Sequence, residues 1–369
     1  MNKLICSAIA TTLLHSSPSV LRAQEAVTSK YKTVFYGHVK TDVIYDAHGV
    51  TGDDYMQYVA SEKDSERDLR ITARGTRFGF DITDGENVSG KIETDFLGLS
   101  ESAGGTAGAT TDLRLRHAYV NLKAGKFDIL AGQTWHLLPL EFAGTNNELV
   151  MGYSGVLWYR APQLRVTYKA GDKVSFAAAA VRPTRKLTDA EGTASGLPQG
   201  QVQAQVKLGK VKLTLTGAAG QWRKSTGEKA AVNLVDLGYN IPLTPAITLN
   251  GQLWTGQNLY DFLGGIGNMG YGTSGVKASG GFADVLIKPA GRFFFNAAYG
   301  LDNPVNTKIA AAATAKTKNT TIMANANCLV YDKVTVTLET ARQTTEYKLS
   351  SGYENIDNMH YQLSFKFPF

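Results

Sequence analysis

The chain has 369 residues, of which 43% are hydrophobic and 19% are charged, with 38 glycines, 17 tyrosines and only 10 prolines. The formal net charge of +6 falls to +4 when Lys3 and Arg22 are removed with the N-terminus, and so weak and dispersed a positive charge gives no reason to expect nucleic acid as a partner. Only Cys328 would remain in such a mature chain, which excludes an intramolecular disulfide. Beyond the N-terminus no window of about 18 consecutive apolar residues predicts a transmembrane helix.

The first 23 residues have the layout of a secretory signal peptide. Lys3 provides a basic start, residues 4–14 are largely apolar, and small residues lead to Ala23. The apolar stretch is shorter than the roughly 20 residues that a membrane-spanning helix needs. We therefore predict export, cleavage after Ala23, a short periplasmic N-terminus over residues 24–30, and a single domain over residues 31–369.

Segments of about ten residues in which apolar and polar side chains alternate predict roughly sixteen β-strands. Most of these strands are joined in pairs by tight turns such as Asp84-Gly85, and long polar segments such as residues 46–68 and 98–111 separate the pairs. The predicted strands cover residues 34–45, 71–82, 88–96, 113–122, 127–133, 164–169, 174–181, 202–208, 211–220, 234–241, 247–254, 276–287, 293–299, 322–330, 334–340 and 359–367. Short turns at one end and long loops at the other are typical of outer-membrane barrels.

The last eleven residues, 359–369, alternate without a break and end on Phe369. A terminal strand of this length would expose an unpaired edge, and closing the sheet into a barrel removes that edge. The fold class predicted is all-β: a transmembrane antiparallel β-barrel of about 16 strands, closed between residues 359–367 and 34–45, with Phe369 as the closure and assembly signal. A soluble β-sandwich with a half-buried last strand is the alternative.

Charged side chains fall in rows on one face of the predicted strands. A Lys or Arg that faced lipid at the bilayer midplane would cost roughly 2–4 kcal/mol, so these rows are expected to line the interior, where so many charges require water. Each charge taken singly could be an ordinary solvated wall residue. The pore-lining and selectivity candidates, chosen by position and alternation, are Arg77, Arg114, Arg116, Arg165, Lys169, Glu93 and Asp95.

Residues 134–161 break the alternation and are too apolar for a simple external loop. They occupy the place of the third loop, which in sixteen-stranded porins folds into the lumen. We therefore predict a constriction loop that includes Trp135, His136, Glu141 and Glu148, with the two glutamates facing cations on the opposite wall. An external loop that packs on a neighbouring subunit is the alternative.

Three sequence segments resemble the DcaP-like trimeric porins: residues 34–46, residues 114–120 (RLRHAYV) and residues 131–135 (AGQTW). The resemblance implies a homotrimer and a preference for negatively charged small solutes such as dicarboxylates. Members of that family often carry an N-terminal coiled coil, for which residues 24–30 leave no room. A trimer would then depend on contacts between barrel walls.

The function expected is a water-filled channel in the bacterial outer membrane, spanning it many times, for passive diffusion of small hydrophilic solutes with a bias towards anions. Expected partners are outer-membrane lipid, small anionic or polar solutes, further copies of the chain and the barrel assembly machinery. The six histidines show no paired spacing, and neither a G-x-S-x-G motif nor a metal-ligand pattern occurs, so we expect no enzymatic activity, no metal and no cofactor. A non-conducting structural or adhesive barrel, and less favoured an outer-membrane enzyme, are the alternatives.

Overall fold

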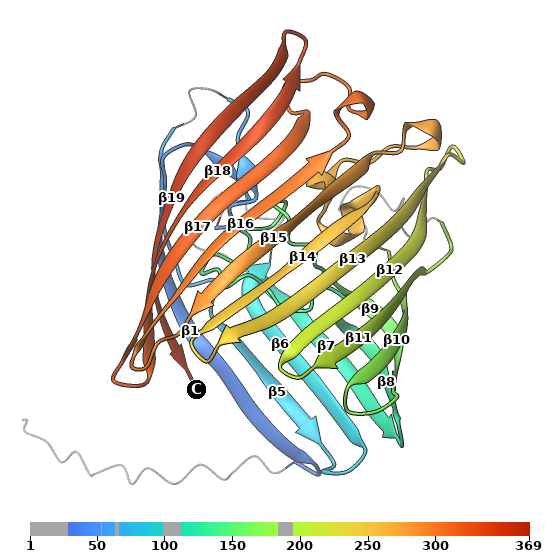
Figure 1. The fold of residues 1–369 in the computed structure, drawn as a ribbon, viewed down its shortest axis with the longest axis vertical. Coiled ribbons are helices and arrows are strands. Elements are labelled where there is room, and N and C mark those ends of the chain that lie inside the picture. Colours follow the sequence, from blue (N-terminus) through green and yellow to red (C-terminus); the bar gives the residue numbers. More distant parts are fainter. Residues whose placement is uncertain (1–28, 53, 63–65, 99–111, 184–194) are drawn as a thin grey trace, which may run out of the picture.

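The computed structural model describes residues 29–52, 54–62, 66–98, 112–183 and 195–369. The predicted signal peptide, residues 1–23, and most of the segment 24–30 lie outside the described residues. Antiparallel strands form one tilted sheet that closes on itself (Figure 1). The strands of this sheet are β1 (Lys32–Asp46), β4 (Asp68–Thr72), β5 (Arg77–Thr83), β6 (Val88–Gly98), β7 (Asp112–Ala124), β8 (Phe127–Trp135), β9 (Arg160–Lys169), β10 (Val174–Val181), β11 (Gln199–Leu208), β12 (Val211–Arg223), β13 (Lys229–Thr244), β14 (Ile247–Gln257), β15 (Lys277–Ile287), β16 (Phe293–Pro304), β17 (Lys316–Val330), β18 (Val334–Leu349) and β19 (Gly352–Pro368).

The barrel has sixteen strand positions, as the alternation predicted. β4 and β5 both pair with β1 and together occupy one position, interrupted at residues 73–76. β19 pairs with β1 and closes the sheet, and Phe369 and Gly37 exchange two backbone hydrogen bonds of 3.0 Å. Closure matters because each unpaired backbone group in hydrocarbon would cost several kcal/mol. The predicted pairing of the last strand with the first is confirmed.

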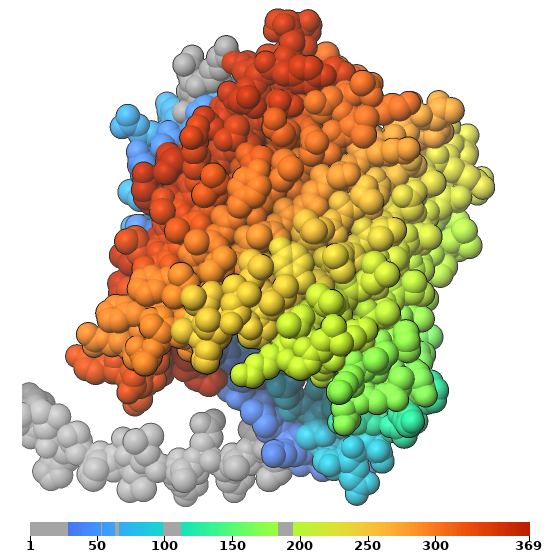
Figure 2. All heavy atoms as spheres, viewed as in Figure 1, coloured from blue at the N-terminus to red at the C-terminus, as the bar shows by residue number. Residues whose placement is uncertain are grey.

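Alternation sorts the side chains of the wall as expected. On β19, His360, Gln362 and Ser364 are buried inside the barrel, whereas Phe365 and Phe367 are exposed on the outer surface. Large apolar residues are similarly exposed on the neighbouring strands, and Figure 2 shows this side of the wall as a continuous surface. An outer surface of this kind fits lipid as its solvent.

Several strands are longer than the sequence pattern indicates. Residues 221–233 and 341–358 were expected to be mainly loops, but most of them belong to β12, β13, β18 and β19. Near the ends of β18 and β19 both faces carry polar residues, for example Gln343 inside and Thr344 outside, so no apolar alternation marks them. On β12 and β13 the inward residues of these segments, such as Trp222 and Val232, are apolar instead of polar. The β18–β19 hairpin therefore rises furthest at the end that carries the long loops (Figure 1).

Among the described residues, three loops at this end fold into the barrel, whereas the sequence predicts this only for the loop between β8 and β9. The first holds a small hairpin of β2 (Val50–Thr51) and β3 (Tyr58–Val59), and the segment between β8 and β9 follows the inner wall. The loop between β14 and β15 carries the 3-10 turns η1 (Leu259–Phe262), η2 (Gly265–Gly267) and η3 (Gly272–Ser274). A further turn, η4 (Asn306–Lys308), follows β16. None of the described helices is long and apolar enough to cross a bilayer.

The interior is therefore not wet throughout, which corrects the expectation from the charged rows. The inward residues Trp222, Leu234 and Trp254 are buried with Leu259 and Phe262 of η1 in an apolar cluster inside the barrel. Burying apolar side chains of this size is worth roughly 1.5–3 kcal/mol each. This part of the lumen is closed by packing, and a cavity lies towards β1, β5–β7 and β19.

Candidate functional site at the constriction of the barrel

The constriction loop, residues 136–159, connects β8 with β9 and lies along the inner wall of the barrel. Asn147 shows how it is held, because its backbone N–H donates to Glu339 Oε1 at 2.8 Å and its side-chain amide donates to Gln362 Oε1 at 3.0 Å. Gly144 N–H likewise donates to the Asp284 carboxylate at 3.2 Å. The predicted inward third loop is thus confirmed. The wall residues that bind the loop include Gln201, Gln252, Asp284, Asn325, Glu339 and Gln362.

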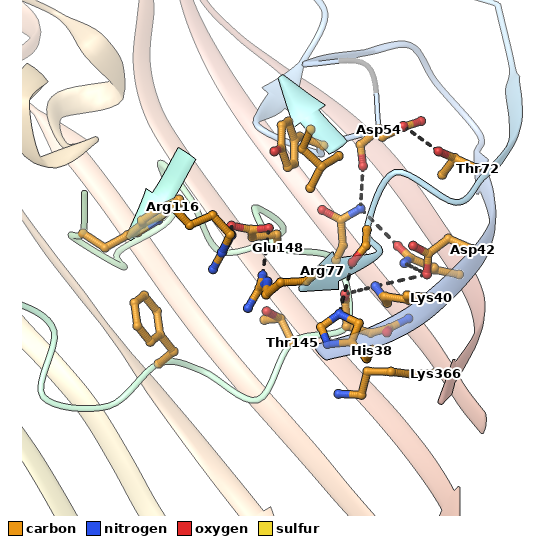
Figure 3. Close-up of a pocket in the computed structure, with 18 of the residues that line it drawn as sticks. His38, Lys40, Asp42, Asp54, Thr72, Arg77, Arg116, Thr145, Glu148 and Lys366 are labelled. Carbon is orange, nitrogen blue, oxygen red and sulfur yellow. Dashed lines mark hydrogen bonds and ion pairs between the residues drawn. The ribbon is translucent and has the colours of Figure 1, made fainter. Parts of the chain in front are cut away.

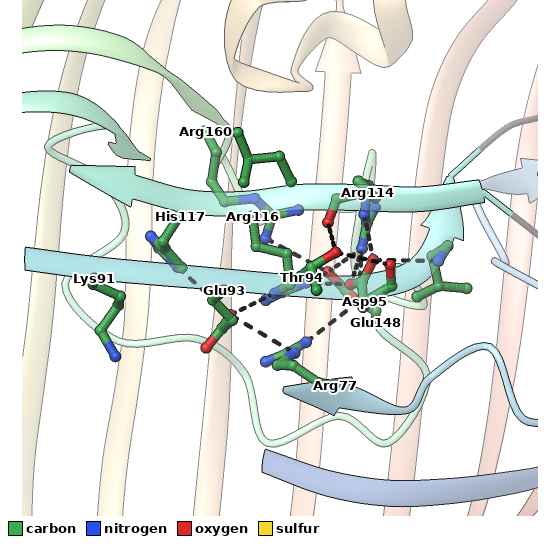
Figure 4. Close-up of polar contacts among 12 residues, drawn as sticks. Arg77, Lys91, Glu93, Thr94, Asp95, Arg114, Arg116, His117, Glu148 and Arg160 are labelled. Carbon is green, nitrogen blue, oxygen red and sulfur yellow. Dashed lines mark hydrogen bonds and ion pairs between the residues drawn. The ribbon is translucent and has the colours of Figure 1, made fainter. Parts of the chain in front are cut away.

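Glu148 of this loop sits among four arginines (Figure 4). Its carboxylate oxygens lie 2.9 Å from Arg116 Nη1, 3.3 Å from Arg114 Nη2, 3.7 Å from Arg77 Nη2 and 3.8 Å from Arg160 Nη1. Burial by itself raises the pKa of Glu148, but the charges of these guanidinium groups outweigh it and hold the pKa well below its usual range. The carboxylate is therefore ionised at neutral pH and ties the loop to the wall.

Two wall carboxylates complete the arginine cluster. Asp95 accepts from Arg114 Nη2 at 2.6 Å and from Arg116 Nη1 at 2.8 Å, and Glu93 accepts from Arg116 Nε at 2.7 Å. We use "arginine cluster" for Arg77, Arg114, Arg116 and Arg160 together with Glu93, Asp95 and Glu148. Removing one partner from a buried network of this kind costs about 3–5 kcal/mol, because charges are left uncompensated.

A β-bulge in β7 gives Arg116 its position. The register between β6 and β7 shifts between Glu93 and Thr94, so that Glu93 lies opposite His117 and Thr94 opposite Leu115. Arg116 and His117 are consecutive residues, yet both are buried inside the barrel. A bulge re-aims side chains in this way and is often found beside functional sites. Strict alternation would have turned His117 outward.

Aromatic rings pack beside the arginine cluster. The ring centroid of Trp135 lies 5.0 Å from that of Phe142 and 5.3 Å from that of Trp158. The Arg160 guanidinium carbon lies 4.4 Å from the centroid of Trp135, within the range of a cation–π contact. These rings support the loop and shield one side of the arginines.

A cavity of about 480 Å³ opens beside the cluster (Figure 3). Arg77, Arg116 and Glu148 line one part of it, and Lys40 of β1 and Lys366 of β19 line another. Lys40 Nζ lies 3.1 Å from Asp42 Oδ1 and donates to the carbonyl oxygen of Asn146 at 2.9 Å. Lys366 is exposed within the barrel and forms no ion pair with any described residue.

The structure brings together five of the seven predicted wall residues and separates two. Arg77, Arg114, Arg116, Glu93 and Asp95 all belong to the arginine cluster. Arg165 instead donates to the carbonyl oxygen of Trp135 and to Gln163 Oε1, and Lys169 lies at the far end of β9, 2.5 Å from Asp128. Neither Arg165 nor Lys169 lines the cavity.

The predicted residues of the constriction loop also lie at different places, only some of them beside the cavity. Trp135 ends β8 and lines the cavity with Glu148, whereas Glu141 pairs with Lys212 at 3.3 Å. His136 is buried against Phe262, and burial, with a smaller contribution from the charge of Arg165, lowers its pKa to about 3. Glu148 touches its cations directly, so the structure does not show the arrangement predicted, in which glutamates face cations across an open lumen.

Sequence reasoning did not select four residues of the site: Lys40, Tyr55, Arg160 and Lys366. Lys40 and Lys366 belong to inward-facing rows visible in the alternation, so a signal for them existed. The sequence pattern predicts a loop over residues 134–161 and so does not single out Arg160, whereas β9 begins at this residue. Tyr55 gives no sequence signal, since its position follows from the folding of the first loop. Among the described residues no three His, Cys, Asp or Glu side chains converge to hold a metal ion.

A closed sixteen-stranded barrel with an inward third loop beside a charged cavity defines the porin class of fold. No family model matches the chain, and no curated protein sequence does. Among solved structures it is similar to the outer membrane channel DcaP of Acinetobacter baumannii, with a TM-score of 0.76 and 18% identity over 93% of this chain and 99% of that one. The predicted likeness to DcaP is confirmed at the level of the fold.

Two further structures of outer-membrane proteins share the architecture. The anion-selective porin from Comamonas acidovorans matches with a TM-score of 0.59 and 13% identity over 92% of this chain and 100% of that one. OmpT, an outer membrane protein of Vibrio cholerae in its trimer form, matches with a TM-score of 0.58 and 11% identity over 92% of this chain and 100% of that one. The chain thus has the fold of outer-membrane porins.

Proposed function

We propose that this protein is an outer-membrane porin through which small hydrophilic solutes diffuse, with a preference for anions such as dicarboxylates. The observation that carries the proposal is the cavity beside the constriction loop, where Lys366 is exposed near Lys40 and Arg77. No energy source or cofactor is needed, because solutes move down their own gradients.

The carboxylates of this region are engaged by partners, which favours the anion preference. Glu148 is surrounded by four guanidinium groups, Asp42 lies beside Lys40 and accepts from Gln362 at 2.9 Å, and Asp54 accepts from Arg74 at 3.0 Å. The exposed ammonium of Lys366 has no such partner among the described residues. A unit charge about 4 Å away in water is worth ~1 kcal/mol, which enriches a monovalent anion about fivefold and depletes a cation equally.

The cellular context follows from the same reading of the sequence. We propose that residues 1–23 are removed on export, that residues 24–30 remain in the periplasm, and that residues 31–369 form the barrel with its short turns on the periplasmic side. Outer membrane proteins of this fold include OmpT in its trimer form, which supports a homotrimer whose outer walls contact each other and lipid. Phe369 follows the closing strand directly, at the turn end of the barrel, which supports its proposed role as the signal for the assembly machinery.

The test is the reversal potential of purified, folded protein in a planar bilayer under a salt gradient. An anion-selective channel is expected, and dicarboxylates should carry current or compete with chloride for the pore. A cation-selective channel would remove the anion proposal. A folded barrel that shows no ohmic conductance would instead favour the non-conducting structural or adhesive alternative.

A further inference from the structure

The first loop of the barrel enters the lumen, although its charged sequence suggested an external segment. We call its described residues 47–52 and 54–62 the inner hairpin. Val59 N–H donates to Thr345 Oγ1 at 3.0 Å, and the side-chain amides of Asn319 and Gln343 each donate to the carbonyl oxygen of Gln57 at 3.2 Å. Inward-facing side chains of β17 and β18 therefore hold the hairpin in place.

The inner hairpin also binds the constriction loop. Asn147 Nδ2 donates to the carbonyl oxygen of Asp54 at 3.1 Å, and the Asp54 side chain accepts from Arg74 at 3.0 Å and from Thr72 at 2.9 Å. Tyr55 of the hairpin belongs to one apolar cluster with Ala143, Val150 and Met151 of the constriction loop. The two loops consequently form one packed unit inside the barrel.

Tyr55 is a residue of the inner hairpin whose side chain reaches the cavity beside the arginine cluster. The side chain is 8% exposed and lines the same cavity as Arg77, Arg116 and Lys366. The Arg114 guanidinium carbon lies 5.6 Å from its ring centroid. Its hydroxyl is buried and has no hydrogen-bond partner among the described residues, an arrangement that normally costs about 1–3 kcal/mol. The side chain that carries this hydroxyl lines a cavity whose basic groups include Arg77, Arg116 and Lys366.

The protonation state of Tyr55 suits this role. Burial raises the pKa of its hydroxyl well above the ordinary value, and the negative charge of Glu148 adds to the effect. The phenol therefore keeps its proton at neutral pH and acts as a donor. The hydroxyl would have a hydrogen-bond acceptor only while a permeating carboxylate occupies the cavity.

We propose that the inner hairpin is a second constriction element and that Tyr55 is a specificity-determining residue, narrowing the passage and donating a hydrogen bond to an anionic solute. The proposal rests on the proposed porin function and deepens it. Size selection is then shared between the first and third loops, and oxygen recognition is shared between Tyr55 and the basic side chains of the cavity.

The first test removes only the hydroxyl. Tyr55→Phe should lower the permeability to succinate, measured by reversal potential under mixed succinate and chloride, about fivefold, the factor that corresponds to loss of a ~1 kcal/mol hydrogen bond. Its thermal stability should equal or exceed that of the wild type, because the hydroxyl has no partner to lose. Tyr58→Phe is the matched control: Tyr58 lies in the same hairpin, against Tyr153 and Lys316, and does not line the cavity.

The second test probes the passage directly. In a Cys328→Ser background, Tyr55→Cys should be modified by a methanethiosulfonate reagent applied in the bilayer, with an irreversible fall in single-channel current, whereas Tyr58→Cys should change little. A wild-type channel that is not anion-selective would refute the proposed function. An anion-selective channel in which Tyr55→Phe keeps its succinate permeability, or Tyr55→Cys keeps its full current after modification, would overturn the inference about Tyr55.

Discussion

Replacing Glu148 with Gln tests the electrostatic account of the constriction. The substitution keeps the shape of the side chain but removes a negative charge that lies 2.9–3.8 Å from four guanidinium groups. Among the described residues, Glu93 and Asp95 would be the carboxylates left to balance these guanidinium groups. One unit of charge about 4 Å from the passage in water is worth ~1 kcal/mol, so a monovalent anion should be enriched about fivefold further and a cation depleted equally.

The assay for Glu148→Gln is the reversal potential in a KCl gradient, with single-channel conductance as a second reading. The potential should move towards the anion limit, and conductance should become noisier because the loop loses a charged anchor. Glu141→Gln is the matched control, since Glu141 forms a partly exposed pair with Lys212 that contributes at most about 1 kcal/mol. An unchanged potential, or a move towards cation selectivity, would refute the reasoning.

Further predictions use the same bilayer and folding assays. Lys366→Glu should shift the reversal potential towards cations, whereas Lys169→Glu, outside the cavity, should shift it far less; equal shifts would contradict the assignment of the cavity. Deleting Phe369 removes two 3.0 Å backbone hydrogen bonds to Gly37 and a ring contact with Phe35. Folding into detergent or lipid should therefore slow, and the barrel should unfold at a lower temperature. Unchanged folding kinetics and an unchanged melting temperature would exclude the closure role of Phe369. The pKa of Glu148 is depressed, so its stabilising charge is present above the unfolded pKa and is lost only as the pH falls through the lower folded pKa. The difference in reversal potential between wild type and Glu148→Gln should therefore persist from pH 8 to pH 5. Disappearance of this difference within that range would refute the charged state of Glu148.

Local rules predicted the wall of the barrel well. Period-two alternation depends only on neighbouring residues and on which solvent each face meets, so it located all sixteen strand positions and the pairing of residues 359–367 with 34–45. Alternation failed to mark strand residues where the inner face is not polar or the outer face is not apolar. Near the tops of β18 and β19 both faces are polar, and on β12 and β13 the inward residues Trp222 and Leu234 are apolar because η1 packs on them.

The site was predicted in part. Charged rows on adjacent strands brought Arg77, Glu93 and Asp95 into the candidate set, since side chains on one face of paired strands are neighbours. Arg165 and Lys169 satisfied the same rule but lie elsewhere, because alternation gives the face of a residue and not its height in the barrel. The unusual apolar content of residues 134–161 indicated an inward loop but could not show which wall residues would bind it.

The sequence by itself determined the barrel, its closing strands, the inward third loop and the inward direction of most charged side chains, because these follow from local periodicity and from the cost of facing lipid with a charge. Only the tertiary structure decided which charges meet. Glu148 reaches four arginines from three other strands, a bulge turns both Arg116 and His117 inward, and Tyr55 arrives on a loop held by β17 and β18. Contacts between residues so far apart in the chain depend on strand register and loop packing, which no local pattern records.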